Sequence, residues 1–289
     1  MPKIVQFTHP GSEHKPDKKN SNLKSWNTGN HKRKFLLSKG EYIHENKAKE
    51  AELVFWGEWE PPSHVKVLPN KPNNFFPQWL HEPYLPEILP NSTGYQASYQ
   101  NTDPCVFDGE FKYFVCKQFK PKNKKLTSLA RLERGSIILF GSTGNQNTED
   151  AFFQLDTVFV VSNYIEYDIS DPNSLSDAGL GIYRDYAFKM AFPNPSDFSL
   201  KLRLYKGATF QNPVDGMYSF SPAKVWANQD IGFPRISLSN MDYITNNLNA
   251  APKVTNASTI EVVNFWNQIR EITKKCGCVE GVKFNYSYQ

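Results

Sequence analysis

The apolar residues of this chain come in short runs, and this limits its fold more than any other feature. The longest runs, SIILF and VFVV, have the length of β-strands and are far too short to cross a membrane. An aromatic content of 14% also favours a β-rich protein. Apolar runs and alternation predict strands at residues 3–7, 34–37, 51–59, 111–116, 136–141, 154–161, 186–192 and 201–205.

One helix is predicted near the C-terminus, at residues 258–276. Ser258 and Glu261 form a capping box, and Gly277 supplies a stop. The buried face of this helix is expected to consist of Val262, Trp266, Ile269 and Thr273. A second helix is predicted at 237–248. The fold class expected is therefore α+β, mostly antiparallel, with a C-terminal packing helix.

Prolines punctuate residues 60–105 so densely that neither a regular helix nor a central strand is expected there. The aromatic residues of this segment predict a packed loop close to a ligand. We expect one elaborated domain over residues 1–289. Its parts are a basic N-terminal segment (1–50), the proline and aromatic loop (60–105), a barrel core (106–205) and a C-terminal loop and helix region (206–289).

The predicted hairpin at 136–161 has a recognisable pattern. A Leu-x-x-Gly step from Leu132 to Gly135 leads into SIILF, a polar loop follows, and a second strand ends in VFVV. This stretch of about 30 residues resembles the PUA-like barrel superfamily, including ASCH and EVE-type modules, although Ser136 stands where those modules often carry Asp. The resemblance implies a barrel with a pocket for one nucleobase, often a modified one. Proteins of this kind also occur among prokaryotic nucleotide-modification and antiviral systems.

The stretch ELVFWGEWE places aromatic and acidic side chains together. On a strand, Trp56, Glu58 and Glu60 would share one face. A flat indole beside two carboxylates suits a flipped base, because the ring stacks and the acids accept hydrogen bonds or activate water. The alternative is an edge strand whose glutamates face solvent.

All six histidines lie in the first 81 residues: His9, His14, His31, His44, His64 and His81. His9 follows the first predicted strand and is a candidate general acid or base beside Trp56. Residues 1–50 carry eleven Lys and Arg against five acids, a balance that suits a polyanion. Within this segment, His31, Arg33 and Lys34 are the candidate phosphate contacts.

Other candidates lie further along the chain. Asp156 interrupts an apolar strand, so it is either exposed on the polar face or held in a pocket as a third acid. Gln118 and Tyr218 are candidate base contacts. Cys116 is expected to be a core residue, because no base or elbow motif neighbours it in the sequence.

The segment DPCVFDGEFK suggests a competing enzyme. Asp103 or Asp108, followed by Glu110 and Lys112, matches the loose pattern of metal-dependent nucleases, in which acids hold Mg²⁺ and a lysine steadies the nucleophile. The same pattern often arises by chance in a half-exposed strand that follows an Asp-Gly turn.

The sequence therefore predicts a cytoplasmic protein with reduced thiols that binds nucleic acid, with DNA the expected form, and accepts a single base. If it is an enzyme, hydrolysis of the base–sugar bond, as in a DNA glycosylase, fits Glu58, Glu60, Asp156 and His9 and needs no cofactor. One alternative is a Mg²⁺-dependent nuclease. The other is a non-catalytic adaptor whose aromatic segment 73–90 docks a partner protein.

Overall fold

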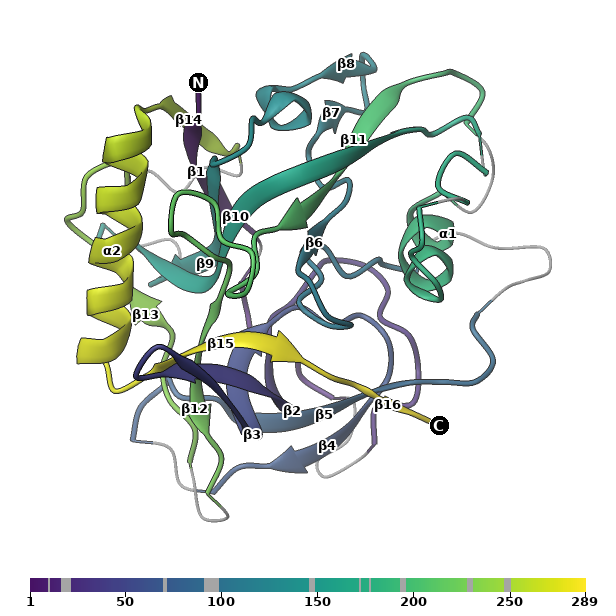
Figure 1. The fold of residues 1–289 in the computed structure, drawn as a ribbon. Helices are drawn as coiled ribbons and strands as arrows, with labels where there is room; N and C mark the ends of the chain where they lie inside the picture. The colour runs from purple at the N-terminus through teal and green to yellow at the C-terminus, as the bar shows by residue number, and fades with distance from the viewer. Residues whose placement is uncertain are drawn as a thin grey trace.

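The computed structural model describes residues 1–9, 11–16, 22–69, 72–90, 99–145, 149–171, 173–176, 178–192, 196–227, 231–246 and 251–289. Within these ranges the protein is mostly β, with two α-helices, in agreement with the predicted α+β class. Two seven-stranded sheets account for most strands. In Figure 1 they lie one above the other, with α2 along the left side of the upper sheet.

The first sheet follows the order β14–β1–β9–β10–β11–β6, and β13 pairs with β10. Its strands are β14 (Lys253–Asn256), β1 (Lys3–Thr8), β9 (Ile137–Gly144), β10 (Phe152–Asp168), β11 (Lys201–Gly207), β6 (Lys112–Tyr113) and β13 (Ile236–Ser237). The β1–β9 pair is parallel, and the other pairs of this sheet are antiparallel. The hairpin predicted at 136–161 is confirmed as β9 and β10.

The second sheet follows the order β15–β12–β3–β2–β5–β16, and β4 pairs with β5. Its strands are β15 (Val279–Phe284), β12 (Ser221–Val225), β3 (Lys47–Gly57), β2 (Lys34–His44), β5 (Trp79–Leu85), β16 (Ser287–Tyr288) and β4 (Ser63–Val67). β15 also pairs with β2, so the pairings run from β2 through β3, β12 and β15 and back to β2. A small hairpin of β7 (Phe119–Lys120) and β8 (Lys125–Leu126) stands apart.

Both faces of the first sheet are buried. Val5 and Phe7 of β1 pack with Phe55 of the second sheet in one apolar cluster. On the opposite face, Ile4 and Leu139 belong to a second cluster, which includes the apolar side of α2. Strands covered on both faces are apolar at consecutive positions, and this is the physical origin of runs such as SIILF.

The helix α2 (Thr259–Lys275) confirms the prediction made from its capping box. Ser258 Oγ accepts from the backbone N–H of Glu261, and the Glu261 carboxylate accepts from the backbone N–H of Ser258. The four residues expected on its buried face are buried. Gly277 follows with a φ of +68°, where a side chain would be strained.

Three predictions of secondary structure are wrong. Residues 186–192 are not a strand but fall in a π-helical turn (Arg184–Phe188) followed by the short α1 (Lys189–Ala191). The proline-rich segment 60–105 contains β4 and β5. The strand β5 accommodates Pro83 because this residue lies between the positions that pair with β2 and those that pair with β16. Residues 237–246 contain no helix, and 247–248 lie outside the described residues.

The remaining helical element is a 3₁₀ turn at Ser128–Arg131. In the part of the chain that the structure describes, no helix combines the length and the apolar character that a membrane crossing requires.

Candidate functional site

A chain of buried charged side chains lies where strand ends of both sheets meet. His9 directly follows β1, Arg33 precedes β2, Glu58 follows β3, and Asp156 lies within β10. All four side chains are at most 2% exposed. Taking charges out of water costs several kcal/mol per ion unless they are paired. Buried ionisable groups that interact strongly cluster at functional sites, so we take this cluster as the candidate site.

Strand pairing brings Arg33 and Glu58 together. In the β2–β3 hairpin, Lys34 lies opposite Gly57, so the residues just beyond them are neighbours as well. Arg33 Nη1 donates to Glu58 Oε2 at 2.8 Å. Glu58 is thereby held as an anion at the open end of the hairpin, and neighbouring positive charge keeps its pKa low despite burial.

A β-bulge directs Asp156 into the interior. Leu155 pairs with Gly141 of β9, but Thr157 pairs with the adjacent residue, so Asp156 is the extra residue. The Asp156 carboxylate lies between two guanidinium groups, with Oδ2 3.0 Å from Arg33 Nε and Oδ1 3.1 Å from Arg235 Nε. The sequence left open whether Asp156 is exposed or held in a pocket, and the structure shows that it is buried.

The other end of the charge network is a thiol. His9 Nδ1 lies 2.9 Å from Glu58 Oε2, and His9 Nε2 lies 3.0 Å from Cys116 Sγ. Burial lowers the pKa of His9 to about 4, against the opposing effect of Glu58. Burial also raises the pKa of the Cys116 thiol well above its usual value. The histidine and the thiol are therefore both neutral near pH 7.

His31 and Glu60 extend the network toward solvent. Although burial opposes a charge on His31, Glu58 and Glu60 raise its pKa to about 10, so it is a cation at neutral pH. Its Nδ1 lies 2.8 Å from Glu60 Oε1 and 3.1 Å from Glu58 Oε1. The His31 side chain is 25% exposed, and its ring stacks on that of His9.

His31, Glu58 and Glu60 are also the described side chains whose oxygen and nitrogen atoms lie close enough together to hold a metal ion, within 4.8 Å of one another. Their acceptor oxygens already have N–H partners. Besides the histidines, Glu60 accepts from Asn27 Nδ2, and Glu58 Oε1 accepts from the backbone N–H of Asp103. The cationic histidine and these donors favour an ion-pair cluster over a metal centre.

The acids of the nuclease alternative have separate partners. The Asp103 carboxylate accepts backbone N–H groups of residues 114–116, and burial raises its pKa to about 7. Glu110 forms an ion pair with Lys206. Asp108 is exposed in a turn. Within the described residues these three acids form no close group of metal ligands, and Lys112 donates to backbone carbonyls.

A cavity of about 190 Å³ adjoins the Asp156 end of the network, and Trp56 and Arg235 line it. The Arg235 guanidinium lies 4.1 Å from the centre of the Trp56 ring, and the indole N–H donates to Phe233 O. Trp56 is therefore covered by an arginine rather than open for stacking on a base. Glu58 and Glu60 do not line this cavity, contrary to the shared wall that strand alternation predicted.

Arg235 has donors in excess of its partners. Its Nη1 donates to Gly11 O and Ser142 Oγ, whereas its Nη2 is buried without an acceptor among the described residues. The side chain is 7% exposed. Buried N–H groups without a partner are rare in folded proteins, so an acceptor from a ligand or from water is expected at this atom.

Four predicted site residues lie elsewhere or are used differently. Arg33 and Lys34 are buried and face acids, so they cannot contact phosphate at the surface. Gln118 is buried and bonds to backbone groups of Phe114 and Arg203. Tyr218 is buried in a separate cluster, in which its hydroxyl donates to Glu280 and accepts from Arg270.

Two residues of the network were missed or misjudged from the sequence. Cys116 was expected to be a core residue, and it does pack against the larger apolar cluster, but nothing in the sequence indicated its contact with His9. Arg235 has no local pattern that distinguishes it. The available signal was indirect, because a buried acid such as Asp156 requires cationic partners from some other segment.

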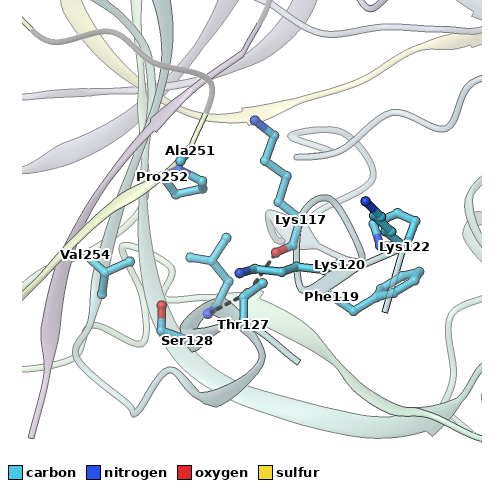
Figure 2. Close-up of a pocket in the computed structure, with 11 residues that line it drawn as sticks. Lys117, Phe119, Lys120, Lys122, Thr127, Ser128, Ala251, Pro252 and Val254 are labelled. Carbon is cyan, nitrogen blue, oxygen red and sulfur yellow. Dashed lines mark hydrogen bonds between the residues drawn. The ribbon is translucent and has the colours of Figure 1, made fainter. Parts of the chain in front are cut away.

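Lysines gather around a second and larger pocket, of about 460 Å³. Figure 2 shows Lys117, Lys120 and Lys122 with Phe119 along one side, and Pro252 with Val254 on the other. Lys120 and Lys122 belong to the exposed β7–β8 hairpin, whose segment 117–125 carries five lysines and no acid. This pocket is cationic at its rim and apolar in its lining.

Comparison of the chain with protein-family models, with curated proteins and with solved structures finds no match. The resemblance to PUA-like modules stays a prediction.

Proposed function

We propose that this protein binds nucleic acid in the cytoplasm and takes one base into the cavity beside Arg235. The observation that carries this proposal is that Arg235 lines a small cavity while its Nη2 is buried without a hydrogen-bond partner among the described residues. Ligand pockets for drug-sized molecules span roughly 300–1,000 Å³, so a cavity of about 190 Å³ suits a single ring system.

The chemistry of the cavity favours a base edge. Arg235 Nε faces Asp156 and Nη1 donates to Gly11 O and Ser142 Oγ, so Nη2 remains to donate to one acceptor on a base edge, such as O6 or N7 of guanine. Asp156 and the Trp56 ring fix the plane of Arg235 before any ligand arrives. Phe75 and Phe76 also line the cavity and offer aromatic surfaces for stacking.

The basic β7–β8 hairpin supplies phosphate contacts in this proposal. Lys120 and Lys122 are exposed, and they replace the buried Arg33 and Lys34 in the role that the sequence suggested. Phosphate contacts fix the position of the protein on the nucleic acid but do not depend on its sequence, whereas contacts to a base edge distinguish one base from another.

The finer fold that we propose is a PUA-like barrel with its core in residues 106–205, around the β9–β10 hairpin of the first sheet. The series of pairings that returns from β15 to β2 lies in the second sheet, outside this core. Hydrolysis of the base–sugar bond remains the enzymatic form of the hypothesis. Glu58, Glu60 and Asp156 are engaged in ion pairs, so binding is the part that the geometry supports best.

Binding of labelled single-stranded and duplex oligonucleotides, with plain and modified bases, tests the proposal. Arg235→Lys keeps the charge but loses the planar fork, and it is expected to weaken binding of the preferred base about 5- to 150-fold. Arg134→Lys, at an exposed arginine that bonds to a backbone carbonyl, is the matched control and should leave affinity unchanged. Equal affinity of the folded Arg235→Lys protein and the wild type would refute the base site.

A salt titration tests the phosphate contacts separately. Lys120→Gln with Lys122→Gln should weaken binding equally for all sequences and reduce the slope of log affinity against log salt by roughly 2. An unchanged slope would remove the hairpin from the interface. Alkali-labile strand breaks, assayed on the same oligonucleotides, test the hydrolytic form.

A further inference from the structure

Cys116, His9 and Glu58 form a relay with the geometry of a nucleophile, a base and an orienting acid. The thiol sulfur lies 3.0 Å from His9 Nε2, and His9 Nδ1 lies 2.9 Å from Glu58 Oε2. Both distances are within hydrogen-bond reach, which is the first requirement for general-base catalysis. The base-binding cavity described above does not include any of the three residues.

The partners of Glu58 determine which nitrogen of His9 carries the proton. Arg33 and the backbone N–H of Asp103 both donate to the Glu58 carboxylate, which is held as an anion and can only accept. His9 Nδ1–H therefore donates to Glu58. This leaves Nε2 with a lone pair that accepts from the Cys116 thiol, the arrangement required for removing its proton.

Cys116 lies at the margin of the apolar core, next in sequence to a residue that lines a surface pocket. Cys116 is half-buried in the turn that follows β6, and the next residue, Lys117, lines the pocket of about 460 Å³. Figure 2 shows Lys117, Lys120 and Lys122 around this pocket. Three lysines contribute to its lining, so the potential there is positive and favours an anionic ligand.

We propose that Cys116 is the nucleophile of an acyl-transfer activity toward anionic esters or amides, with His9 as general base and Glu58 as its positioning residue. As Sγ forms a bond to the carbonyl carbon, the S–H bond breaks and His9 Nε2 takes the proton. The bond from the carbonyl carbon to the leaving oxygen or nitrogen then breaks, and its electron pair leaves with that atom, which takes the proton from His9. Water attacks the thioester with the same base and releases the acid and the free thiol.

The pH profile of this relay differs from that of a free thiol. Because burial lowers the pKa of His9 to about 4, Nε2 is unprotonated above roughly pH 5, and the protonation state of His9 does not change the rate over that range. The groups that face the pair from the surrounding elements are Glu58, Arg33, His31, Asp103 and Lys117. Of these, Asp103, with a pKa of about 7, titrates within the working range.

Cys276 is the internal control. It is exposed at the end of α2. The nucleophile of an unassisted cysteine is the thiolate, so acylation without a base should slow steeply as the pH falls. Acylation of the intact protein by 4-nitrophenyl acetate and by the anionic mono-4-nitrophenyl succinate is followed at each cysteine by mass spectrometry, from pH 4.5 to 8.5.

The expected result is that acylation of Cys116 changes less than about threefold between pH 5 and 8 and is faster with the anionic ester. His9→Gln should slow it about 100-fold or more, and Cys276→Ser should leave it unchanged. The proposal is overturned if Cys116 follows the same pH line as Cys276, or if it stays unmodified and the release of 4-nitrophenol does not exceed that accounted for by Cys276. The wild-type profile decides this even if His9→Gln fails to fold. Equal rates with the two esters would refute the anionic preference. Because oligonucleotide binding is measured separately, neither result depends on the other.

Discussion

At the scale of single residues, the site depends on one carboxylate shared by two arginines. Asp156 lies between Arg33 and Arg235, and all three side chains are at least 93% buried. Desolvation raises the pKa of this acid, while Arg235 and Arg33 oppose that effect. If the carboxylate were lost, Arg235 would lose the acid that pairs with it in low dielectric, and Arg33 would keep only Glu58.

We therefore expect Asp156→Asn to lower the free energy of unfolding by about 3–5 kcal/mol, the usual cost of breaking a buried ion pair. Glu166→Gln is the control, because Glu166 is 55% exposed and its pair with Arg203 should be worth about 0–1 kcal/mol. Denaturant unfolding of both variants measures the difference. A similar loss in the two proteins would show that Asp156 is not the centre of the network.

Some site residues were visible in the sequence and some were not. Glu58 and Asp156 attracted attention because an acid beside or within an apolar run must be exposed or paired, which is a local signal. The role of Cys116 was invisible because His9 reaches it only through the parallel pairing of β1 with β9 and the packing of the β6 turn. The proposed base contact moved from Trp56 to Arg235 for the same reason, because one side chain covers another only in the folded chain.

At the scale of elements, the bulge in β10 aims Asp156 inward. Gly141 lies opposite Leu155 in this region, and a Cβ there would come within 2.1 Å of Gln154 O and 2.5 Å of the Phe153 ring. Only glycine fits so close to a neighbouring backbone. His9 N also donates to Gly141 O, so the same residue helps to position the histidine.

Gly141→Ala is expected to destabilise the protein by about 2 kcal/mol or more, because the bulge must shift. Gly57→Ala makes a matched comparison. Gly57 is a buried strand glycine as well, but its nearest contacts are side-chain atoms at 3.2 Å, so the cost should be smaller. Thermal and denaturant unfolding give both values, and an equal cost would argue against a special role for the bulge.

Element prediction succeeded where the signal was local. The capping box and buried face of α2 lie within one stretch of chain, so Ser258 and Glu261 identified its start. The strand predicted at residues 186–192 was wrong because a short apolar run does not distinguish a strand from a buried helical turn. β5 was missed because the acceptable position of Pro83 depends on where β2 and β16 stop pairing, which is decided by other segments.

At the scale of the whole molecule, the buried histidines tie stability to pH on the acid side. Burial lowers the pKa of His9 to about 4, of His14 to about 3 and of His81 well below its usual value. Between about pH 4.5 and 6.5 the unfolded chain binds these protons and the folded protein does not. Burial raises the pKa values of Asp103 and Asp156, so the folded protein binds up to two protons there that the unfolded chain does not. These two protons offset part of the histidine effect.

The net effect is largest near pH 5, where the three histidines of the unfolded chain are protonated and outnumber the two acids, so stability falls there with decreasing pH by roughly 1.4 kcal/mol per unit. Urea unfolding at half-unit steps from pH 4.5 to 6.5 measures the slope. A flat profile would mean that the three histidines are not buried in neutral form.

The alkaline side depends on His31, whose pKa rises on folding to about 10. Its contribution is complete below about pH 6.5 and is lost as the pH rises toward 10, on the order of 2 kcal/mol. Replacing His31 by Gln should flatten the alkaline decline, whereas His44→Gln, at a 48% exposed histidine, should not. The same unfolding experiment extended to pH 10 compares the two.

The network of polar contacts runs from Cys116 at one end to Arg235 at the other, and the strand ends that supply it come from both sheets. Neither sheet alone supplies all of its members. Substitutions that loosen the packing between the sheets are therefore expected to impair both proposed activities together. The packing of one sheet on the other therefore positions the reacting groups as well as stabilising the fold.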